Sequence, residues 1–213
     1  MVRSDMKDLL KELLETIALA LLIFLALQAT VRNYRVELSS MEATLFPKDR
    51  LVINKLVYFH VDREAIDRLV PFVDIWRDGE VLFPFHAPRR GDVIVFRFPR
   101  DPSRDFVKRV IGLPGESVSL ERGYVFIDGK RLDEPYLEEQ DDSNMAPTLV
   151  PPGSYFVMGD NRDGSSDSRH WGTVPLENIV GKVLLRYWPF SEFSFLSGGS
   201  PNALADGSVE NPE

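Results

Sequence analysis

The sequence predicts a mostly β domain preceded by one N-terminal transmembrane helix. Two observations carry this prediction. After residue 35, short runs of β-branched and aromatic residues alternate with Gly and Pro turns, which is typical of all-β or mostly β domains. Before that point, residues 16–31 contain no charged side chain. A chain of 213 residues has room for one such domain with appendages.

The predicted helix is the uncharged run 16–31, TIALALLIFLALQATV, which follows a short N-terminal segment, residues 1–15. As a helix it spans about 24 Å, slightly less than a hydrocarbon core of about 30 Å. Leu13 and Leu14 extend it if Glu15 reaches the interface. A cleaved signal peptide and a buried core helix are the alternatives, but the cleavage site is poor and the preceding segment is acidic. The flanking charges do not set the orientation of the helix.

The rest of the chain divides into strand-like runs and turns. The runs lie at residues 50–58, 93–98, 106–111, 124–127, 154–158 and 180–188. Asp128-Gly129 is the strongest turn signal, a dipeptide typical of two-residue hairpins. We expect a β-rich domain over 32–195 with an insertion at 60–88, where prolines interrupt the pattern. Residues 196–213, rich in Gly, Ser, Pro and acids, are expected to form a disordered tail.

Composition excludes several classes of site. A formal net charge of -8 argues against a nucleic-acid partner. The chain has no Cys, which excludes disulfides and a catalytic thiol. His60, His86 and His170 show no metal-ligand spacing, so neither a metal site nor another cofactor is expected.

The polar run 159–172 holds three Asp, three Ser and two Arg between two apolar runs. It is either a solvated loop or part of a site, since functional residues commonly lie on loops that a rigid scaffold holds. A second feature is Lys108, which shares one face of an apolar strand with Phe106 and Val110. A lysine there costs free energy unless it loses its proton or finds a partner, although an edge-strand lysine that prevents aggregation is the plainer interpretation.

A serine and such a lysine can form a catalytic pair. A serine hydroxyl is a weak nucleophile that needs a neighbouring base. A lysine acts as that base only when neutral, so its pKa must fall from about 10.4, and apolar burial lowers it. A drop of about three units corresponds to roughly 4 kcal/mol. The segment 39–45, a few residues beyond the predicted helix, offers Ser39 and Ser40 as candidate partners of Lys108.

Together these segments resemble bacterial type I signal peptidase, a membrane-bound Ser–Lys endopeptidase. Its nucleophile signature, Ser-Met-x-Pro-Thr-Leu, corresponds to residues 40–45, Ser-Met-Glu-Ala-Thr-Leu. Its base signature matches residues 108–116 without a break, and residues 159–169 match the third signature. Residues 89–96 are also similar, so the resemblance covers roughly residues 10–190.

The resemblance implies a catalytic domain of coiled antiparallel sheets and a role for each matching residue. Ser40 is the expected nucleophile and also supplies a backbone N–H to the oxyanion hole. Lys108 is the expected general base, and Ser165 is expected to hydrogen-bond and orient its amine. The residues expected to support the site structurally are Arg109, Asp160, Arg162, Asp167 and Arg169.

The chain departs from the family pattern at two positions. Ala43 stands where the family usually has Pro. Leu38 stands where many members have a Ser that joins the oxyanion hole, and loss of such a donor costs roughly 2.7–4 kcal/mol of transition-state stabilisation. Two segments look similar to the site but are assigned no chemistry. Ser39 adjoins Ser40 but is expected to point the other way, and residues 145–149 follow Asn144 where a serine is required.

The implied function is removal of signal peptides from exported pre-proteins after small residues, at Ala-x-Ala-like sites, through an acyl-enzyme. The implied partners are signal peptides and the lipid bilayer. The implied location is the cell membrane, with a single-pass anchor and the catalytic domain on the extracytoplasmic side. Two alternatives stay open: a soluble Ser–Lys autoprotease of the repressor-cleaving type, which residues 16–31 oppose, and a weak or inactive relative that binds signal peptides.

Overall fold

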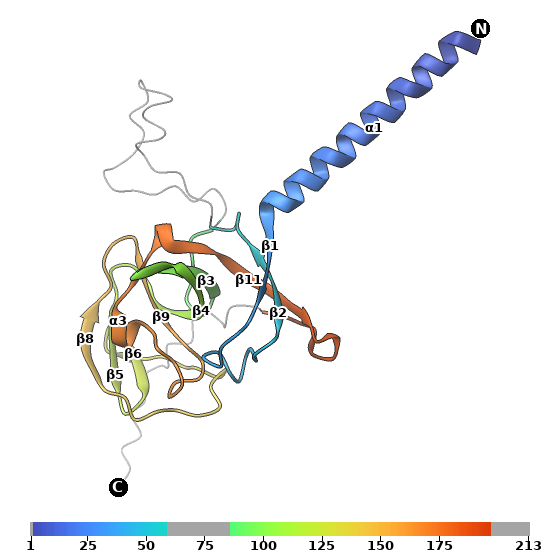
Figure 1. Ribbon diagram of the computed structural model, residues 1–213. Helices are drawn as coiled ribbons and strands as arrows, with labels where there is room; N and C mark the ends of the chain where they lie inside the picture. Colours follow the sequence, from blue (N-terminus) through green and yellow to red (C-terminus); the bar gives the residue numbers. More distant parts are fainter. Residues whose placement is uncertain (1, 59–85, 197–213) are drawn as a thin grey trace, which may run out of the picture.

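The computed structural model describes residues 2–58 and 86–196 (Figure 1). The predicted insertion at 60–88 and the predicted tail at 196–213 lie outside these residues, apart from their ends at 86–88 and 196. The chain begins with one long helix, α1 (Val2–Thr30), and continues mainly in strands. A mostly β domain behind an N-terminal helix is therefore confirmed.

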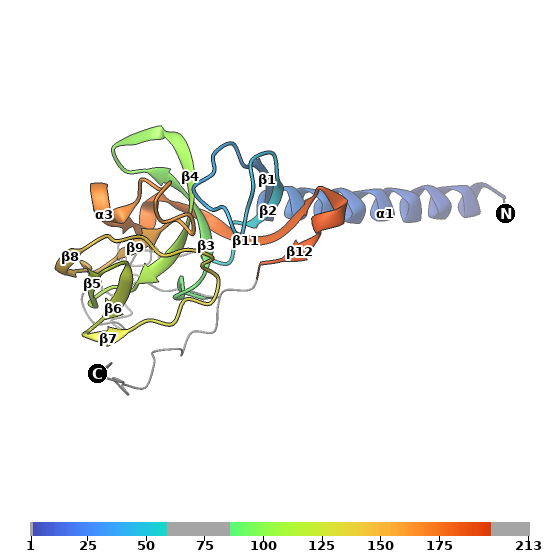
Figure 2. The same cartoon turned by 90° about the horizontal axis from the view of Figure 1, so that it is seen from below.

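Helix α1 projects away from the β domain (Figures 1 and 2). It joins the segment 1–15 and the predicted anchor in one element, and it ends at Thr30, where β-branched and aromatic residues begin. Many of its large apolar side chains are more than half exposed: Leu13, Leu14, Ile17, Leu19, Leu21, Leu22, Ile23, Phe24 and Leu25. Within the described part of the chain, no helix is both long enough and apolar enough to cross a membrane. The predicted transmembrane helix is thus not confirmed.

The larger sheet contains eight strands in the described residues, and all of its strand pairs are antiparallel. Its order is β1-β2-β11-β3-β4-β9-β10, with β12 paired to β11. The strands are β1 (Val31–Arg35), β2 (Arg50–Asn54), β3 (Val93–Phe98), β4 (Asp101–Gly112), β9 (Ser154–Met158), β10 (Val174–Pro175), β11 (Ile179–Trp188) and β12 (Ser194–Phe195). The strand predicted at 106–111 begins earlier, at Asp101, and the one predicted at 50–58 ends at Asn54.

A smaller sheet has the order β7-β6-β5-β8. Its strands are β5 (Ser117–Glu121), β6 (Tyr124–Ile127), β7 (Lys130–Arg131) and β8 (Met145–Leu149). The β6–β7 hairpin turns at Asp128 and Gly129, whose φ angles are 50° and 78°. Two positive φ values are what a tight hairpin of this type requires, so the predicted turn is confirmed. Segment 145–149, similar in sequence to part of the nucleophile signature, is an edge strand of this sheet.

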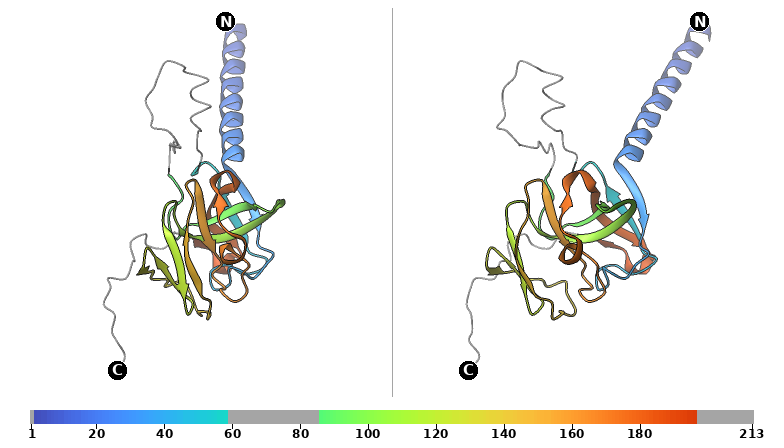
Figure 3. Two further views of the ribbon diagram at one scale, coloured as in Figure 1. Left: turned by 90° about the vertical axis from the view of Figure 1, so that its left-hand side faces the viewer. Right: turned by 60° about the vertical axis from the view of Figure 1, so that its left-hand side comes forward.

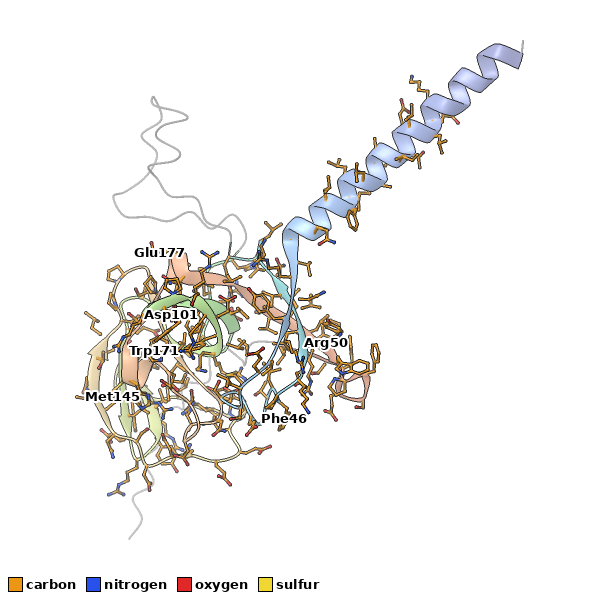
Figure 4. The ribbon with its side chains drawn as sticks, viewed as in Figure 1. Phe46, Arg50, Asp101, Met145, Trp171 and Glu177 are labelled. Carbon is orange, nitrogen blue, oxygen red and sulfur yellow. The ribbon has the colours of Figure 1, made fainter. Side chains whose placement is uncertain are left out.

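Strand β3 lies at the centre of the core because both of its faces are buried. Val93 and Val95 pack into a cluster with side chains of β2 and β11, while Ile94 and Phe96 pack on the other face. On that second face, the short helix α3 (Ser168–Trp171) places Trp171 against Phe96, with ring centroids 5.9 Å apart. Figure 4 labels Trp171 close to Asp101, at the tip of the β3–β4 hairpin. The core thus fixes both the hairpin and the polar loop before α3.

The larger sheet leaves a gap between its first strand and β4. In the described residues, β9 pairs with β4 only from Arg109 to Gly112, so residues 103–108 of β4 keep one edge free of strand partners. This edge faces β1 and its continuation, residues 36–41, and Figure 3 (left) shows the green β3–β4 hairpin reaching toward the blue chain of β1. We call the gap between residues 34–41 and residues 103–108 the seam.

Candidate active site

The seam contains a cleft of about 760 Å³. Residues 34–41 line one wall and residues 103–108 line the other. Val95, Phe98, Gly164 and Ser166 complete the lining. Both walls are strand edges or their direct continuations, so backbone groups as well as side chains face the space between them.

Ser40 and Lys108 meet across the seam. Lys108 on β4 donates from Nζ to Ser40 Oγ at 2.6 Å and to the carbonyl oxygen of Val107 at 3.1 Å. Only 4% of Lys108 is exposed. The structure therefore brings together the two residues that sequence analysis selected as nucleophile and base.

The surroundings of Lys108 favour its neutral form. Burial lowers the pKa of the amine to about 8, against the opposing effect of the Asp167 and Asp160 carboxylates. The ring of Phe106 lies 5.7 Å from Nζ, on the same face of the strand. A substantial fraction of this amine is consequently unprotonated at mildly alkaline pH, when it can accept a proton from a hydroxyl group.

Ser40 lies in a turn whose ends are anchored in the core. Met41 and Leu45 are 1% and 0% exposed, and the N–H of Leu45 donates to the Met41 carbonyl at 2.7 Å. Ser39 and Ser40 were expected to point apart because strand neighbours alternate, but neither residue is in a strand. Both line the cleft, and the turn rather than strand alternation directs the hydroxyl of Ser40 to Lys108.

The turn after Ser40 has a backbone conformation that proline cannot adopt. Ala43 has a φ of 81°, and the N–H of Thr44 donates to the Met41 carbonyl at 3.0 Å. A proline ring fixes φ near -65°. The alanine at this position is therefore part of a different local turn from the one that a proline would form.

Position 38 offers the cleft no side-chain hydrogen-bond donor. Leu38 lines the cleft with 61% of its surface exposed. Within the described chain, the backbone N–H of Ser40 donates to no other group. That N–H is available to a developing oxyanion in the cleft.

The predicted hydrogen bond between Ser165 and the Lys108 amine is wrong. Ser165 Oγ is buried and has no hydrogen-bond partner of normal geometry among the described residues. The hydroxyl instead packs so tightly over Gly159 that a Cβ there would lie 2.3 Å from it. Ser165 thus borders the site without holding the amine.

Asp167 and Arg169 form the ion pair that the sequence suggested, with Arg169 Nε 2.8 Å from Asp167 Oδ1. Asp167 is fully buried and also accepts from the N–H of Gly159 at 3.1 Å. Burial works to raise the pKa of this carboxyl, but the hydrogen bonds and charge of Arg169 hold it below its ordinary value. The pair closes the polar loop on itself.

Arg109 and Asp160 form a second buried pair. Arg109 donates to the carboxylate from Nε at 2.9 Å and from Nη2 at 2.7 Å, and its Nη1 donates to the Gly91 carbonyl at 2.9 Å. Thr44 in the Ser40 turn donates to the same carboxylate at 2.5 Å. This pair links strand β4, the polar loop and the turn that carries Ser40.

The family assignment rests on a match over most of the chain. The family described as "Signal peptidase, peptidase S26" matches residues 10–188. The chain belongs to this family. Signal peptidase I from Leptolyngbya laminosa is 36% identical over 195 residues, which cover 88% of this chain and 84% of the relative. Signal peptidase I from Bacillus caldolyticus is 39% identical over 177 residues, 76% of this chain and 82% of the relative.

A crystal structure of a signal peptidase I from Enterococcus faecalis V583 shares 36% sequence identity. The structural match covers 46% of this chain and 97% of the crystallised chain, with a TM-score of 0.41. Membership of the signal peptidase family makes the chain a serine endopeptidase.

Sequence analysis missed two acidic residues that hold the polar loop of this signal peptidase. Arg162 donates from Nη1 to Glu134 at 3.1 Å, and Arg169 pairs with Asp141. Both acids are at least 91% buried and lie in the connection between β7 and β8. The signal was present as an acidic run at 133–142, but such a run normally indicates a solvated surface.

Asn161 is a third residue whose role was missed. Its backbone N–H donates to the Ser40 carbonyl at 3.2 Å, and its Nδ2 donates to the Ser39 carbonyl at 3.2 Å. The polar loop of the peptidase therefore holds the backbone of the serine turn directly.

Proposed function

We propose that this peptidase removes signal peptides from exported pre-proteins with Ser40 as nucleophile and Lys108 as general base. The observation that carries the proposal is the 2.6 Å contact between the Lys108 amine, whose pKa burial lowers to about 8, and the Ser40 hydroxyl inside an open cleft. A serine becomes nucleophilic when a neighbouring base of suitable pKa takes its proton.

The reaction follows from these positions. The neutral Lys108 amine accepts the hydroxyl proton while Ser40 Oγ bonds to the scissile carbonyl carbon. The backbone N–H of Ser40 donates to the resulting oxyanion. Lysine then gives its proton to the leaving amine, and the acyl group stays on Ser40. In the second half, Lys108 takes a proton from water, the hydroxide releases the acyl group, and Ser40 regains its proton.

The substrate is proposed to bind as an extended segment in the seam. The free edge of residues 103–108 has no strand partner in the described chain, and an extended peptide can bind such an edge by adding a strand. Phe106 and Val107 line this wall, and Leu38 projects from the opposite one. Because these wall residues are bulky, the space beside Ser40 accepts only small substrate residues, as in an Ala-x-Ala site.

Helix α1 is proposed to hold the enzyme at the cell membrane, with the catalytic domain on the extracytoplasmic side. Its large apolar side chains between Leu13 and Leu25 are exposed, and exposed apolar surface of this kind commonly marks a membrane or protein interaction site. A signal peptide also carries an apolar segment, so a shared membrane raises the effective concentration of substrate.

Cleavage of a pre-protein in detergent tests the dyad. We expect Ser40→Ala and Lys108→Ala each to reduce cleavage at least about 10³-fold. Ser119→Ala on β5 and Lys130→Ala on β7 are matched controls, expected to cleave like the wild type. Cleavage by either dyad variant at the wild-type rate would remove the assignment, and loss in Ser39→Ala alone would move it to the neighbouring serine.

Leu38 favours a second candidate, a relative that binds signal peptides and cleaves them slowly. The same experiment separates the two: a wild-type protein that binds the pre-protein without cleaving it is the binding relative.

A further inference from the structure

Two side-chain bridges span the seam. The first is the contact between Lys108 and Ser40. The second is a hydrogen bond in which the hydroxyl of Tyr34 donates to Asp105 Oδ2 at 2.9 Å. Tyr34 is on β1 and Asp105 is on β4, so the bond joins the two walls of the cleft, and both residues line it.

The two bridges enclose a short length of free strand edge. On β4, Asp105 precedes Lys108 by three residues, which corresponds to about 10 Å at 3.3 Å per residue. Residues 105–107 pair with β3 on one side, and the described chain offers their other side no strand partner. The opposite wall between the bridges consists of the chain from Arg35 to Ser39. An extended peptide that fits between the bridges thus pairs over about three residues.

In the second bridge the phenol is half-buried and held by packing, whereas the Asp105 carboxylate is exposed. Tyr34 packs against the hydrophobic cluster that contains Val36, Met41 and Val95, which fixes the position of its ring. Burial and the neighbouring Asp105 carboxylate both raise the pKa of the phenol, so it stays protonated and remains a donor. Arg32, two residues earlier on β1, also acts on the Tyr34 hydroxyl and in the opposite direction.

The position of this bridge relative to α1 sets which part of a substrate meets it. Tyr34 lies four residues after the end of α1 at Thr30, whereas Ser40 lies farther along the chain. If α1 and the apolar segment of the substrate share one membrane, the residues N-terminal to the cleaved bond run from Ser40 toward Tyr34. Residues beyond the third therefore reach the Tyr34–Asp105 bridge.

We propose that Tyr34 and Asp105 form an end stop of the cleft, which limits the substrate segment paired in the seam to about three residues on the N-terminal side of the cleaved bond. This inference rests on the proposed function. The Tyr34–Asp105 pair would then determine specificity, because substrate residues beyond it do not contact the two strand edges. Recognition is then confined to the residues next to the cleaved bond.

Peptides of two lengths test the end stop. One has three residues before the cleaved bond and the other has six, with the same sequence around the bond. We expect kcat/KM of the wild type to differ by less than about twofold between them. In Asp105→Ala, we expect kcat/KM for the longer peptide to exceed that for the shorter one by about fivefold for each backbone hydrogen bond that the longer peptide adds. Tyr34→Phe keeps the ring but removes the hydroxyl. We expect it to raise the ratio of kcat/KM for the longer peptide to kcat/KM for the shorter one, but by less than Asp105→Ala does.

Two controls define the outcomes. Asp142→Ala and Tyr124→Phe remove a carboxylate and a phenol hydroxyl elsewhere on the surface, and both should keep the wild-type ratio. N-methylation of backbone amides in the upstream extension should cancel the gain in Asp105→Ala. The end stop is wrong if the wild type already prefers the longer peptide about tenfold, or if neither seam variant changes the ratio.

Failure of the dyad is a separate result. If the wild type cleaves neither peptide, binding replaces cleavage as the measurement. Fluorescence anisotropy with labelled peptides gives the affinity for the longer peptide relative to the shorter one, in Ser40→Ala and in the double variant that also carries Asp105→Ala. A ratio that rises in the double variant supports the stop independently of catalysis, and an unchanged ratio overturns it.

Discussion

The amine of Lys108 lies 2.6 Å from the hydroxyl of Ser40, in surroundings that leave 4% of the lysine exposed. Since burial lowers the pKa of this amine to about 8, and only the neutral amine accepts a proton, the activity depends on pH in one direction. We expect kcat/KM to rise with pH and to level off above about pH 8. A pH–rate profile with a short peptide substrate measures this limb.

The midpoint of the rising part of the pH–rate profile shows whether the Lys108 amine is buried or solvated in the working enzyme. A limb near the unperturbed lysine pKa of about 10.4 would mean that the amine is solvated in the working enzyme. The midpoint expected here is more than two units lower, so the two results are easily distinguished.

Gly159→Ala should damage both stability and activity. A Cβ at this position would lie 2.3 Å from Ser165 Oγ and 2.3 Å from the Ser40 carbonyl oxygen, so the loop and the serine turn must move apart. Overpacking of this kind costs about 1–3 kcal/mol. Urea denaturation measures the loss, and kcat should fall because Ser40 shifts. Ser165→Ala, which removes a hydroxyl without a hydrogen-bond partner of normal geometry and adds no atom to the contact with Gly159, should cost less than about 1 kcal/mol. Equal losses in the two variants would contradict this explanation.

Ala43→Gly should stabilise the protein. Ala43 has a φ of 81°, where a Cβ costs roughly 1–2 kcal/mol and glycine has no penalty. After the greater chain entropy of glycine is subtracted, we expect a gain of up to about 1 kcal/mol in the free energy of unfolding. Ala146→Gly on strand β8, where φ is not positive, is the control and should lose stability.

Proline at the same position should have the opposite effect. Ala43→Pro, which introduces the residue that the family signature predicts here, is incompatible with a positive φ and should destabilise the turn. A stable and active Ala43→Pro variant would show that the turn can change its conformation.

Glu134→Gln should destabilise the polar loop. The change leaves the buried Arg162 guanidinium without its counter-charge, and removal of one partner from a buried pair typically costs about 3–5 kcal/mol. Glu138→Gln, at an exposed position in the same connection, should be neutral. Thermal unfolding of both variants tests the difference, and similar melting temperatures would show that the buried pair contributes no net stability.

Strand alternation indicated that Lys108 lies on an apolar face, and the family resemblance was needed to assign it as the base. Its apolar neighbours at the i±2 positions indicate burial of that face, and the structure places the amine there. The turn at Asp128-Gly129 could also be predicted from local sequence, because the turn type follows from which residues tolerate positive φ. Features of this kind depend on a few neighbouring residues and can be predicted from sequence.

The partners of the polar loop could not be predicted in this way. Glu134 and Asp141 each lie 28 positions from the arginine that they bind, and nothing local distinguishes them from Glu138. Their burial arises only when the smaller sheet packs beside the loop. The orientation of Ser165 likewise depends on the close approach of Gly159, which is a tertiary contact.

The seam has a consequence for where access to the dyad is controlled. Its two walls, β1 and β4, are neighbours in space but stand at positions one and five in the strand order, with β2, β11 and β3 between them. The separation of the walls therefore depends on the twist accumulated over those strands. Strand β11 shifts register against β2 between Val183 and Leu185 and again between Arg186 and Trp188. Irregularities of this type increase local twist, so the width of the cleft depends in part on the backbone geometry of β11, a strand that does not itself line the cleft.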